Sequence, residues 1–373
     1  MKSIPQNWQD HDNSIKPYIN QKRVVGLFSR IFSLTLLVIL VGTGVWLKLN
    51  EQIVIFVPRN GLLHTLIYCG VLGVLFEGVA FPFQWFHYLI ERKFKLSNQE
   101  PLSWLVDLVK GLCVGTLIGA IALSLLYWCY TEAGARWWFL AWMAFVVLTV
   151  LLAQLAPVLL IPLFFKLSPL EPSPLKERLL GLCKKYGIEI KDIFHLGLGE
   201  KTEKGNAAFV GLGKTKKIII GDTFYQRYSH DEVEAVFAHE LGHQIHDDLW
   251  KGIGLSSLFT FIVFSLSNQA LSIIAPKFSG TFWGTGPALT TFGVLVGIIQ
   301  IPFGVVETFF SRWREQLADQ FASETIQVAN PLANSLEKLT IQNKGQFKPH
   351  WLIEFLTHSH PAPWRRIQRL RNS

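Results

Sequence analysis

The sequence is poor in charged residues, which make up only 17% of its 373 residues. In a soluble globular protein about a quarter of the residues are charged. Half of this chain is hydrophobic, and its mean hydropathy is positive, at +0.30. The shortage of charge argues against an ordinary soluble protein, and the arrangement of the apolar residues in long runs decides the class.

Cysteine is also scarce, and its four copies do not make a disulfide framework. Cys69, Cys113 and Cys129 fall within apolar runs, and Cys183 stands alone in a polar segment. This distribution predicts packing thiols in a protein from a reducing compartment.

Six apolar runs are long enough to cross a bilayer, which takes about 20 residues of helix. The predicted spans are Val24–Leu49, Gly61–Leu89, Trp104–Tyr130, Trp137–Phe165, Gly252–Ala275 and Ala288–Phe310. The first run starts too late and is too long for a cleaved signal peptide, so we expect it to be retained.

Lys and Arg are concentrated in alternate connecting segments. The head, the segments after the second and fourth spans, and the tail are basic, whereas the other three loops carry few cations. Because cytoplasmic loops are enriched in Lys and Arg, this alternation predicts that both termini lie in the cytoplasm. The net charge of +8 then reflects membrane topology, and we expect no nucleic-acid partner.

The chain divides into two predicted parts. Residues 1–165 form an amino-terminal membrane domain of four spans, in which the connection Pro82–Gly111 is expected to lie partly at the membrane interface. Residues 166–373 hold a polar insert, the two further spans (252–275 and 288–310) and a cytoplasmic helical tail from Arg312.

The polar insert is expected to contain a helix, a strand and a β-hairpin. They are predicted at Leu175–Tyr186, Ile188–His195 and Asn206–Gly221. Ser229 and Glu232 then predict a capping box, in which each residue's side chain binds the other's backbone amide. This box would begin the helix that carries the most distinctive motif of the sequence.

That motif is HELGH, from His239 to His243, inside the longer stretch FAHELGHQIHDD. His239 and His243 are four residues apart, so on a helix they lie on one face and can bind one metal ion. Glu240 would lie beside the metal, where it can take a proton from an activated water. H-E-x-x-H is a zinc-protease signature, and the apolar remainder of the helix argues against an incidental polar face.

The third metal ligand must come from elsewhere in the chain. The third histidine of the metzincin pattern is absent, because Leu249 occupies its position. For His246 we favour a role behind the ligands or at the surface. Glu315 and Glu307 are the alternatives on a second helix, and we favour Glu315 because Asp319, four residues later, can fix the tautomer of a ligating histidine.

The sequence resembles the type I CAAX prenyl proteases, which are integral-membrane zinc endopeptidases of the gluzincin group. The motifs that carry the resemblance are HELGH (His239–His243), SRWREQLADQFA (Ser311–Ala322), NAAFVGLGKTKKIIIGDT (Asn206–Thr223) and HSHPAPWRRIQRL (His358–Leu370). The first half of the chain also resembles the family's membrane domain around IERKFKLSNQ (Ile90–Gln99).

The resemblance implies one Zn²⁺ per chain, bound by His239, His243 and Glu315. It implies Glu240 as general base and Asp319 as the residue that orients a ligand. The fold implied is mainly α, a polytopic membrane protein of about six transmembrane helices with a gluzincin-like protease domain, made of a small hairpin or sheet and the H-E-x-x-H helix.

The resemblance also implies a substrate site. His360 and Arg366 would face the cleft, where a histidine donor or a guanidinium can stabilise the oxyanion of the scissile carbonyl. An edge strand made of Asn206, Ala207, Ala208 and Phe209 would pair with an extended peptide through backbone hydrogen bonds. The substrate would be a peptide or protein, either a prenylated C-terminal C-a-a-X sequence or a misfolded membrane protein, approached among membrane lipids.

Two departures from the eukaryotic enzymes concern the location. The sequence has six predicted spans where those enzymes have seven, and it has no dilysine-type ending for retrieval to the endoplasmic reticulum. Both features favour a bacterial relative in the cytoplasmic (inner) membrane, with the endoplasmic reticulum membrane as the alternative.

Several polar residues lie in or near the predicted spans, namely Glu77, Asp107, Lys110, Gln154 and Glu307. Isolated charge in a span is costly and is usually functional or paired. We expect Asp107 to pair with Lys110, whereas Glu77 has no obvious partner. These residues would suit a membrane transporter, but the paired discontinuous helices of transporters are not evident. A non-catalytic zinc-binding scaffold is a further alternative, which the intact Glu240 disfavours.

Overall fold

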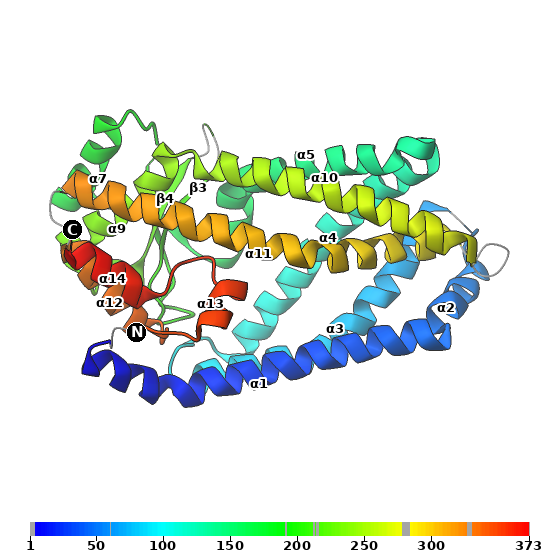
Figure 1. Cartoon of the computed structure of the whole chain (residues 1–373), viewed down its shortest axis with the longest axis horizontal. Coiled ribbons are helices and arrows are strands. Elements are labelled where there is room, and N and C mark those ends of the chain that lie inside the picture. The colour runs from blue at the N-terminus through cyan, green and yellow to red at the C-terminus, as the bar shows by residue number, and fades with distance from the viewer. Residues whose placement is uncertain are drawn as a thin grey trace.

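The computed structural model describes residues 4–59, 61–190, 192–211, 213, 216–277, 284–326 and 330–372. It is mainly helical, with one small sheet, as the sequence predicts. Within these described ranges, six helical segments are long and apolar enough to cross a membrane, which confirms the predicted number of spans. Figure 1 shows some of these segments running along the long axis of the molecule and others crossing it obliquely, with the sheet and both termini at one end.

The first part of the chain contains four of the candidate spans. Its helices are α1 (Gln6–Thr43), α2 (Val45–Val54), α3 (Leu62–Lys93), α4 (Pro101–Glu132), α5 (Trp137–Leu155) and α6 (Ile161–Phe164), with a π-turn at Ala156–Leu160 between the last two. Many of their large apolar side chains are exposed and few are buried, as expected for surfaces that face lipid.

One expectation for this part was wrong in detail. The first span does not run unbroken to Leu49, because Gly44 adopts a left-handed conformation (φ 68°) that ends α1. The segment Pro82–Gly111, which was expected to lie partly at the membrane interface, is helical at both ends, and residues 94–100 connect α3 to α4.

The second part of the chain builds the sheet and its covering helices. Its elements are β1 (Leu167–Pro169), α7 (Pro174–Lys185), β2 (Ile193–Leu196), β3 (Ala207–Val210), β4 (Lys217–Gly221), α8 (Asp222–Tyr225), α9 (His230–Ile245), α10 (Asp248–Ile274), α11 (Thr285–Ile326), α12 (Asn330–Gln342), α13 (Trp351–Thr357) and α14 (Pro363–Asn372).

The sheet has the strand order β1-β2-β4-β3, with β3 and β4 antiparallel and β2 parallel to β4. The predicted hairpin is therefore present, although part of its glycine-containing connection lies outside the described residues. The expected strand in Ile188–His195 is reduced to β2, and β1 was not predicted. Leu175, Ile193, Ile220 and Leu241 are fully buried in the core that joins α7, the sheet and α9.

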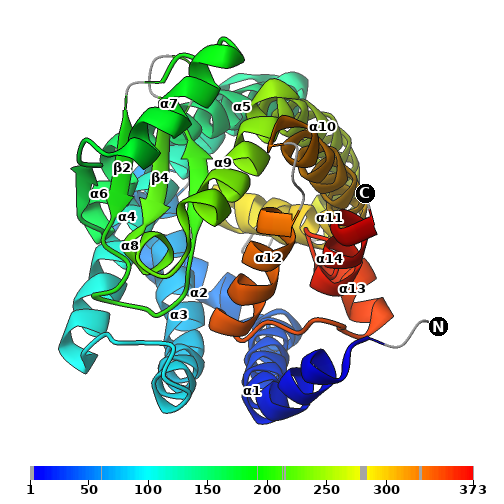
Figure 2. The same ribbon diagram turned by 90° about the vertical axis from the view of Figure 1, so that its left-hand side faces the viewer.

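The most consequential difference concerns α11. The apolar run ends at Phe310, and a polar helical tail was expected from Arg312. The span and the start of this tail are one element, because α11 continues without a break from Thr285 to Ile326. The last span and the SRWREQLADQFA motif thus belong to one helix, whose polar end lies against α9 beside the sheet (Figure 2).

Candidate metal and active site

The helix that carries the HELGH motif is fixed at its start by the predicted capping box. Ser229 Oγ accepts a hydrogen bond from the backbone amide of Glu232, and the Glu232 carboxylate accepts one from the amide of Ser229. Val233, Ala235 and Leu241 are buried against the core. This apolar face holds α9 against the sheet and leaves the face with His239 and His243 directed to α11.

The helices α9 and α11 approach each other closely at Gly242. A Cβ atom at Gly242 would lie 3.1 Å from the Cα of Ala318 and 3.1 Å from a ring carbon of Phe321. Only glycine, which has no side chain, allows this contact without displacing its neighbours. Since Gly242 precedes His243 and Ala318 follows Glu315 by three residues, the contact brings the candidate ligands of the two helices together.

Three side chains converge at this crossing. The ligand atoms of His239, His243 and Glu315 all lie within 4.8 Å of one another. Nε2 of His239 is 3.4 Å from Oε2 of Glu315, and Nε2 of His243 is 3.3 Å from Oε1. Glu307, the alternative third ligand, is not a member of this cluster.

The spacing of these atoms fits a zinc ion. Zinc binds histidine nitrogen and carboxylate oxygen at about 2.0–2.2 Å in tetrahedral geometry, so its ligand atoms lie roughly 3.4 Å apart. The two distances to Glu315 agree with that value. Oε2 of Glu315 is also buried and accepts no hydrogen bond of good geometry among the described residues, although Nη1 of Arg366 lies 3.2 Å from it, so this oxygen keeps capacity for a metal ion.

Each histidine has a carboxylate behind its other ring nitrogen. Nδ1 of His239 lies 2.9 Å from an oxygen of Asp319, and Nδ1 of His243 lies 2.7 Å from an oxygen of Asp248. Such contacts would leave Nε2 of each histidine available to bind a metal ion. The sequence indicated Asp319 but not Asp248, although an acid five residues after the second histidine was visible.

Arg366 and His360 complete the surroundings of Glu315. The guanidinium of Arg366 is buried and forms a two-pronged ion pair with Asp319, at 2.6 and 2.8 Å, while its third nitrogen lies 3.2 Å from Glu315. Nε2 of His360 lies 3.1 Å from Oε1 of Glu315, and its side chain is 61% exposed. The guanidinium of Arg366 is thus fully engaged by Asp319 and Glu315, whereas His360 lies at the solvent-exposed side of the site.

The carboxylates dominate the electrostatics of the site. Burial lowers the pKa of His243, but the carboxylates of Asp248 and Glu315 outweigh burial and raise that pKa to about 10. Burial also lowers the pKa of His239, but hydrogen bonding to Asp319 and Glu315 outweighs burial, so the pKa is raised overall. Burial opposes the charge of Arg366, yet Asp319 raises its pKa above the usual range, so this residue stays cationic.

The remaining predicted residues lie around this cluster. Glu240 follows His239 on α9 and is partly exposed. Strand β3, with Ala207, Ala208 and Phe209, forms one edge of the sheet, and Asn206 before it is exposed. The Phe209 ring contacts Phe237 of α9, with ring centroids 5.8 Å apart. This contact places the edge strand against the helix of the HELGH motif.

Other polar residues singled out in the sequence lie elsewhere. Asp107 pairs with Lys201 and not with Lys110, so the expected pair was wrong: Lys201 reaches Asp107 from the polar insert. Glu77 does have a partner, since it accepts a hydrogen bond of 2.7 Å from Gln84. His246 is the C-cap residue of α9, and its Nδ1 is buried without a partner among the described residues.

Comparison with known proteins gives a consistent answer over the whole chain. The family described as CAAX prenyl protease N-terminal, five membrane helices, matches residues 9–166, and Peptidase family M48 matches residues 169–373. The uncharacterised metalloprotease YhfN of Bacillus subtilis is 25% identical, with 88% of this chain and 78% of that protein aligned.

CAAX prenyl protease 1 of Saccharomyces cerevisiae is 27% identical, with 82% of this chain and 72% of that protein aligned. The crystal structure of Ste24p from S. mikatae has the same fold, with a TM-score of 0.90 at 23% identity over 99% of this chain and 91% of that one. Together with the cluster at the α9–α11 crossing, these matches show that the chain belongs to peptidase family M48 and is a membrane metalloendopeptidase.

Proposed function

We propose that this chain binds one Zn²⁺ through His239, His243 and Glu315 and hydrolyses peptide bonds there. The observation that carries the proposal is the convergence of the three ligand atoms within 4.8 Å, with a carboxylate behind each histidine. A zinc ion bound to these atoms would polarise the scissile carbonyl and lower the pKa of a water molecule to about 7.

Glu240 is the proposed general base. It is adjacent to His239 in sequence and partly exposed, so its carboxylate can reach a water molecule beside the cluster. It would take the proton of the attacking water and return it to the leaving amine. The two proton transfers leave the carboxylate ready for another cycle.

His360 and Arg366 would have different tasks. His360 is largely exposed at the open side of Glu315, which supports a role as a hydrogen-bond donor to the oxyanion. Arg366 is buried and paired with Asp319. Its position supports an indirect role, in which it holds Asp319 behind His239 and balances the negative charge of the two acids.

The edge strand is the proposed docking place of the substrate. The outer side of β3 has no neighbouring strand among the described residues, and β3 contacts the helix of the HELGH motif through Phe209 and Phe237. An extended peptide paired along Ala207–Phe209, with Asn206 at the start, would run beside the cluster.

We propose the bacterial cytoplasmic membrane as the location, with both termini in the cytoplasm. Both termini lie at the sheet end of the molecule (Figure 1), and the basic segments predict that this end faces the cytoplasm. The division into a membrane domain at 1–165 and a protease domain at 166–373 completes the proposal.

A belt of exposed aromatic side chains supports contact with membrane lipids near the site. Trp250 and Trp313, near the cytoplasm-proximal parts of α10 and α11, are 51% and 52% exposed. Helix α13 adds Trp351 and Phe355, four residues apart on one face and 62% and 48% exposed. Tryptophan is enriched where a membrane protein meets the headgroup region, so this belt suits the interface.

The proposed substrate class comes from the relatives, several of which are named CAAX prenyl protease 1. A prenylated C-a-a-X sequence is one candidate, and an unlipidated or misfolded membrane protein is the other. The experiment is to give the purified zinc-loaded protein a farnesylated C-a-a-X peptide and an unlipidated peptide of the same sequence. Strict dependence on the farnesyl group would favour the specialised substrate, whereas equal turnover would favour general endoproteolysis.

The matched control in that experiment is Glu240→Gln. Its uncharged amide has nearly the same shape but cannot take a proton, so we expect cleavage of both peptides to fall by about a hundredfold or more while zinc content is retained. Normal cleavage by this variant would contradict the role of Glu240. A wild-type protein that holds zinc but cleaves neither peptide would instead support the non-catalytic scaffold.

A further inference from the structure

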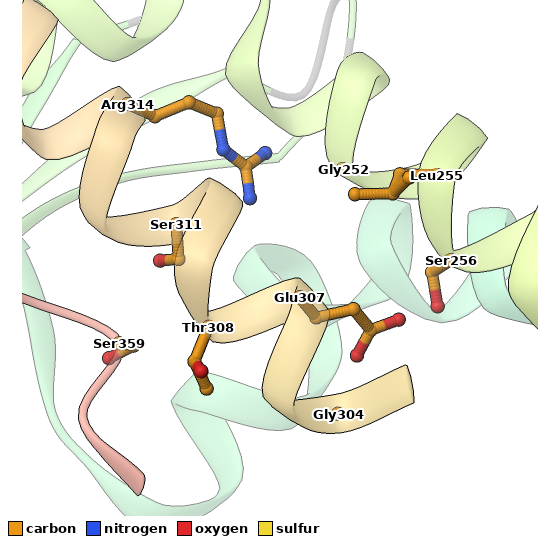
Figure 3. Close-up of a pocket in the computed structure, with 9 residues that line it drawn as sticks. All are labelled: Gly252, Leu255, Ser256, Gly304, Glu307, Thr308, Ser311, Arg314 and Ser359. Carbon is orange, nitrogen blue, oxygen red and sulfur yellow. The ribbon is translucent and has the colours of Figure 1, made fainter. Parts of the chain in front are cut away.

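A pocket of about 280 Å³ lies between α10 and α11, next to the metal cluster. Helix α10 contributes Gly252 and Ser256, α11 contributes Glu307, Thr308 and Arg314, and Ser359 completes the wall (Figure 3). Arg314 and Ser359 directly precede Glu315 and His360, which contact each other. The pocket therefore starts beside the proposed catalytic centre and extends along α11 into the membrane-spanning part.

Glu307 is the unusual member of this pocket. Its carboxylate points into the space between α11 and α10, on the side of Ser256 (Figure 3). Among the described residues, Oε1 of Glu307 is buried without a hydrogen-bond partner, and Glu307 forms no ion pair with a Lys, Arg or His side chain. An unpaired carboxylate in the span of a membrane protein is costly and calls for a cationic partner.

The other charged group of the pocket, the guanidinium of Arg314, is held by a hydrogen bond to the backbone of α10. Nη1 of Arg314 donates a hydrogen bond of 2.7 Å to the backbone carbonyl of Asp248, at the start of α10. Arg314 is seven residues from Glu307, about 10 Å along the helix axis. The guanidinium is thus held at the end near the metal cluster, and the negative charge at the other end remains available.

We propose that this pocket is a specificity subsite that binds the side chain of Lys or Arg in a peptide substrate, through an ion pair with Glu307. This inference rests on the proposed function. It specifies in addition that the preferred peptide carries a positively charged side chain near the scissile bond. The pocket is smaller than the roughly 300–1,000 Å³ of a site for a drug-sized ligand, and it suits one long side chain.

Two further features fit a cationic guest. The hydroxyl of Thr308 donates its hydrogen to the backbone carbonyl of Val305, at 2.8 Å, which leaves its oxygen as an acceptor. Gly252 lets the guanidinium of Arg314 pack directly on α10, because a Cβ atom there would lie 2.9 Å from Nη1 of Arg314, and this keeps the guanidinium at the end of the pocket away from Glu307. A lysine ammonium group or an arginine guanidinium would find acceptors in the carboxylate of Glu307 and the hydroxyl of Thr308.

The test uses a series of peptides of one cleavable sequence without other charges. Lysine is placed at each position on both sides of the scissile bond in turn, and each peptide is paired with one that carries norleucine, a neutral residue of similar length, at that position. The ratio of kcat/KM between the two members of each pair is measured for the zinc-loaded wild type and for Glu307→Gln, Glu307→Asp and Glu324→Gln.

We expect one peptide position at which the wild type prefers lysine by about 10- to 100-fold, the size of a charge-assisted hydrogen bond. Glu307→Gln should bring that ratio close to one, and Glu307→Asp, which keeps the charge, should retain part of the preference. Glu324 lies on the same helix but is exposed and outside the pocket, so Glu324→Gln should retain the wild-type ratio.

Equal cleavage of lysine and norleucine peptides at every position by the wild type would overturn the proposal. So would a lysine preference that survives in Glu307→Gln. In both cases the peptides are cleaved, so only the subsite would fail. If the zinc-loaded wild type cleaves no peptide at all, the proposed function itself fails, and a melting curve and zinc content for each variant show that it is folded.

Discussion

The two histidines of HELGH have carboxylates from different helices behind them. Asp319 comes from α11, the helix of Glu315, whereas Asp248 is the first residue of α10. Helical spacing predicted Asp319, because Glu315 and Asp319 are one turn apart. It could not predict Asp248, because α9 ends at Ile245 and Asp247 turns the chain in a left-handed conformation (φ 52°). Beyond such a turn, the periodicity of a helix no longer says which side chains meet.

Asp248 provides the first prediction at this scale. Asp248→Asn removes the negative charge behind Nδ1 of His243, so zinc affinity should fall by about 10- to 100-fold. Competition with a chelator of known affinity measures the change. Asp247→Asn is the matched control, because Asp247 is adjacent and exposed, and it should bind zinc as the wild type does. Equal affinities for the two variants would show that Asp248 does not support the ligand.

The raised pKa values of the histidines predict how zinc binding depends on pH. Zinc needs a neutral imidazole, whereas Asp248 and Glu315 raise the pKa of His243 to about 10 in the metal-free chain. Protons therefore compete with zinc throughout the neutral range, and affinity should rise with pH. Between pH 6 and 8 we expect about a tenfold gain per pH unit for each proton displaced.

Titration calorimetry in buffers of different ionisation enthalpy counts these protons directly. At pH 7 we expect at least one proton to be released for each zinc ion bound, because His243 is then protonated. The absence of proton release would mean that the histidines are already neutral, contrary to their carboxylate-rich surroundings.

At the scale of elements, the site depends on how closely α9 and α11 cross. The sequence predicted both motifs and the candidate zinc ligands that each supplies. It did not predict that the second motif extends the last membrane span, because apolar periodicity ends at Phe310 while the helix continues to Ile326. Nor did it mark the glycine between the histidines, since the contact of Gly242 with Ala318 exists only after the two helices pack.

A substitution at Gly242 therefore tests whether zinc binding requires the close approach of α9 and α11. Gly242→Leu places a side chain against Ala318 and Phe321, and overpacking of this kind costs typically about 1–3 kcal/mol. We expect the helices to separate and both zinc affinity and the melting temperature to fall. The control is Gly254→Leu on α10, because a Cβ atom at Gly254 meets no atom within 4 Å. A Gly242→Leu protein that binds zinc normally would show that the close crossing is not required.

At the scale of the whole molecule, the count of spans followed from the apolar runs, and the charge of the connecting segments predicted the orientation. Long-range packing was not readable from those patterns. Trp8, near the start of α1, stacks on Phe347 with ring centroids 4.8 Å apart and donates a hydrogen bond of 2.7 Å to Glu337. These contacts pack the amino-terminal end of α1 against the protease domain, although this end precedes the first predicted span in sequence.

An even number of spans, six, places both termini on the same side of the membrane. Both termini also lie at the sheet end of the molecule (Figure 1). A fluorescent protein fused to the carboxyl end should be fluorescent in a bacterial host, since the cytoplasm permits its folding. Alkaline phosphatase fused at the same place should be inactive, whereas a fusion after Gly134, between α4 and α5, should be active. An active phosphatase at the carboxyl end would reverse the proposed orientation.

The most direct test of the account is the location of the metal in crystals of the zinc-loaded protein. Anomalous scattering at the zinc absorption edge should give one strong site per chain, about 2.0–2.2 Å from His239, His243 and Glu315. Elemental analysis should find one zinc per chain in the wild type and in Glu307→Ala, and a large loss in Glu315→Ala. A zinc site away from these three side chains, or peptide cleavage by fully metal-free protein, would contradict the central claim.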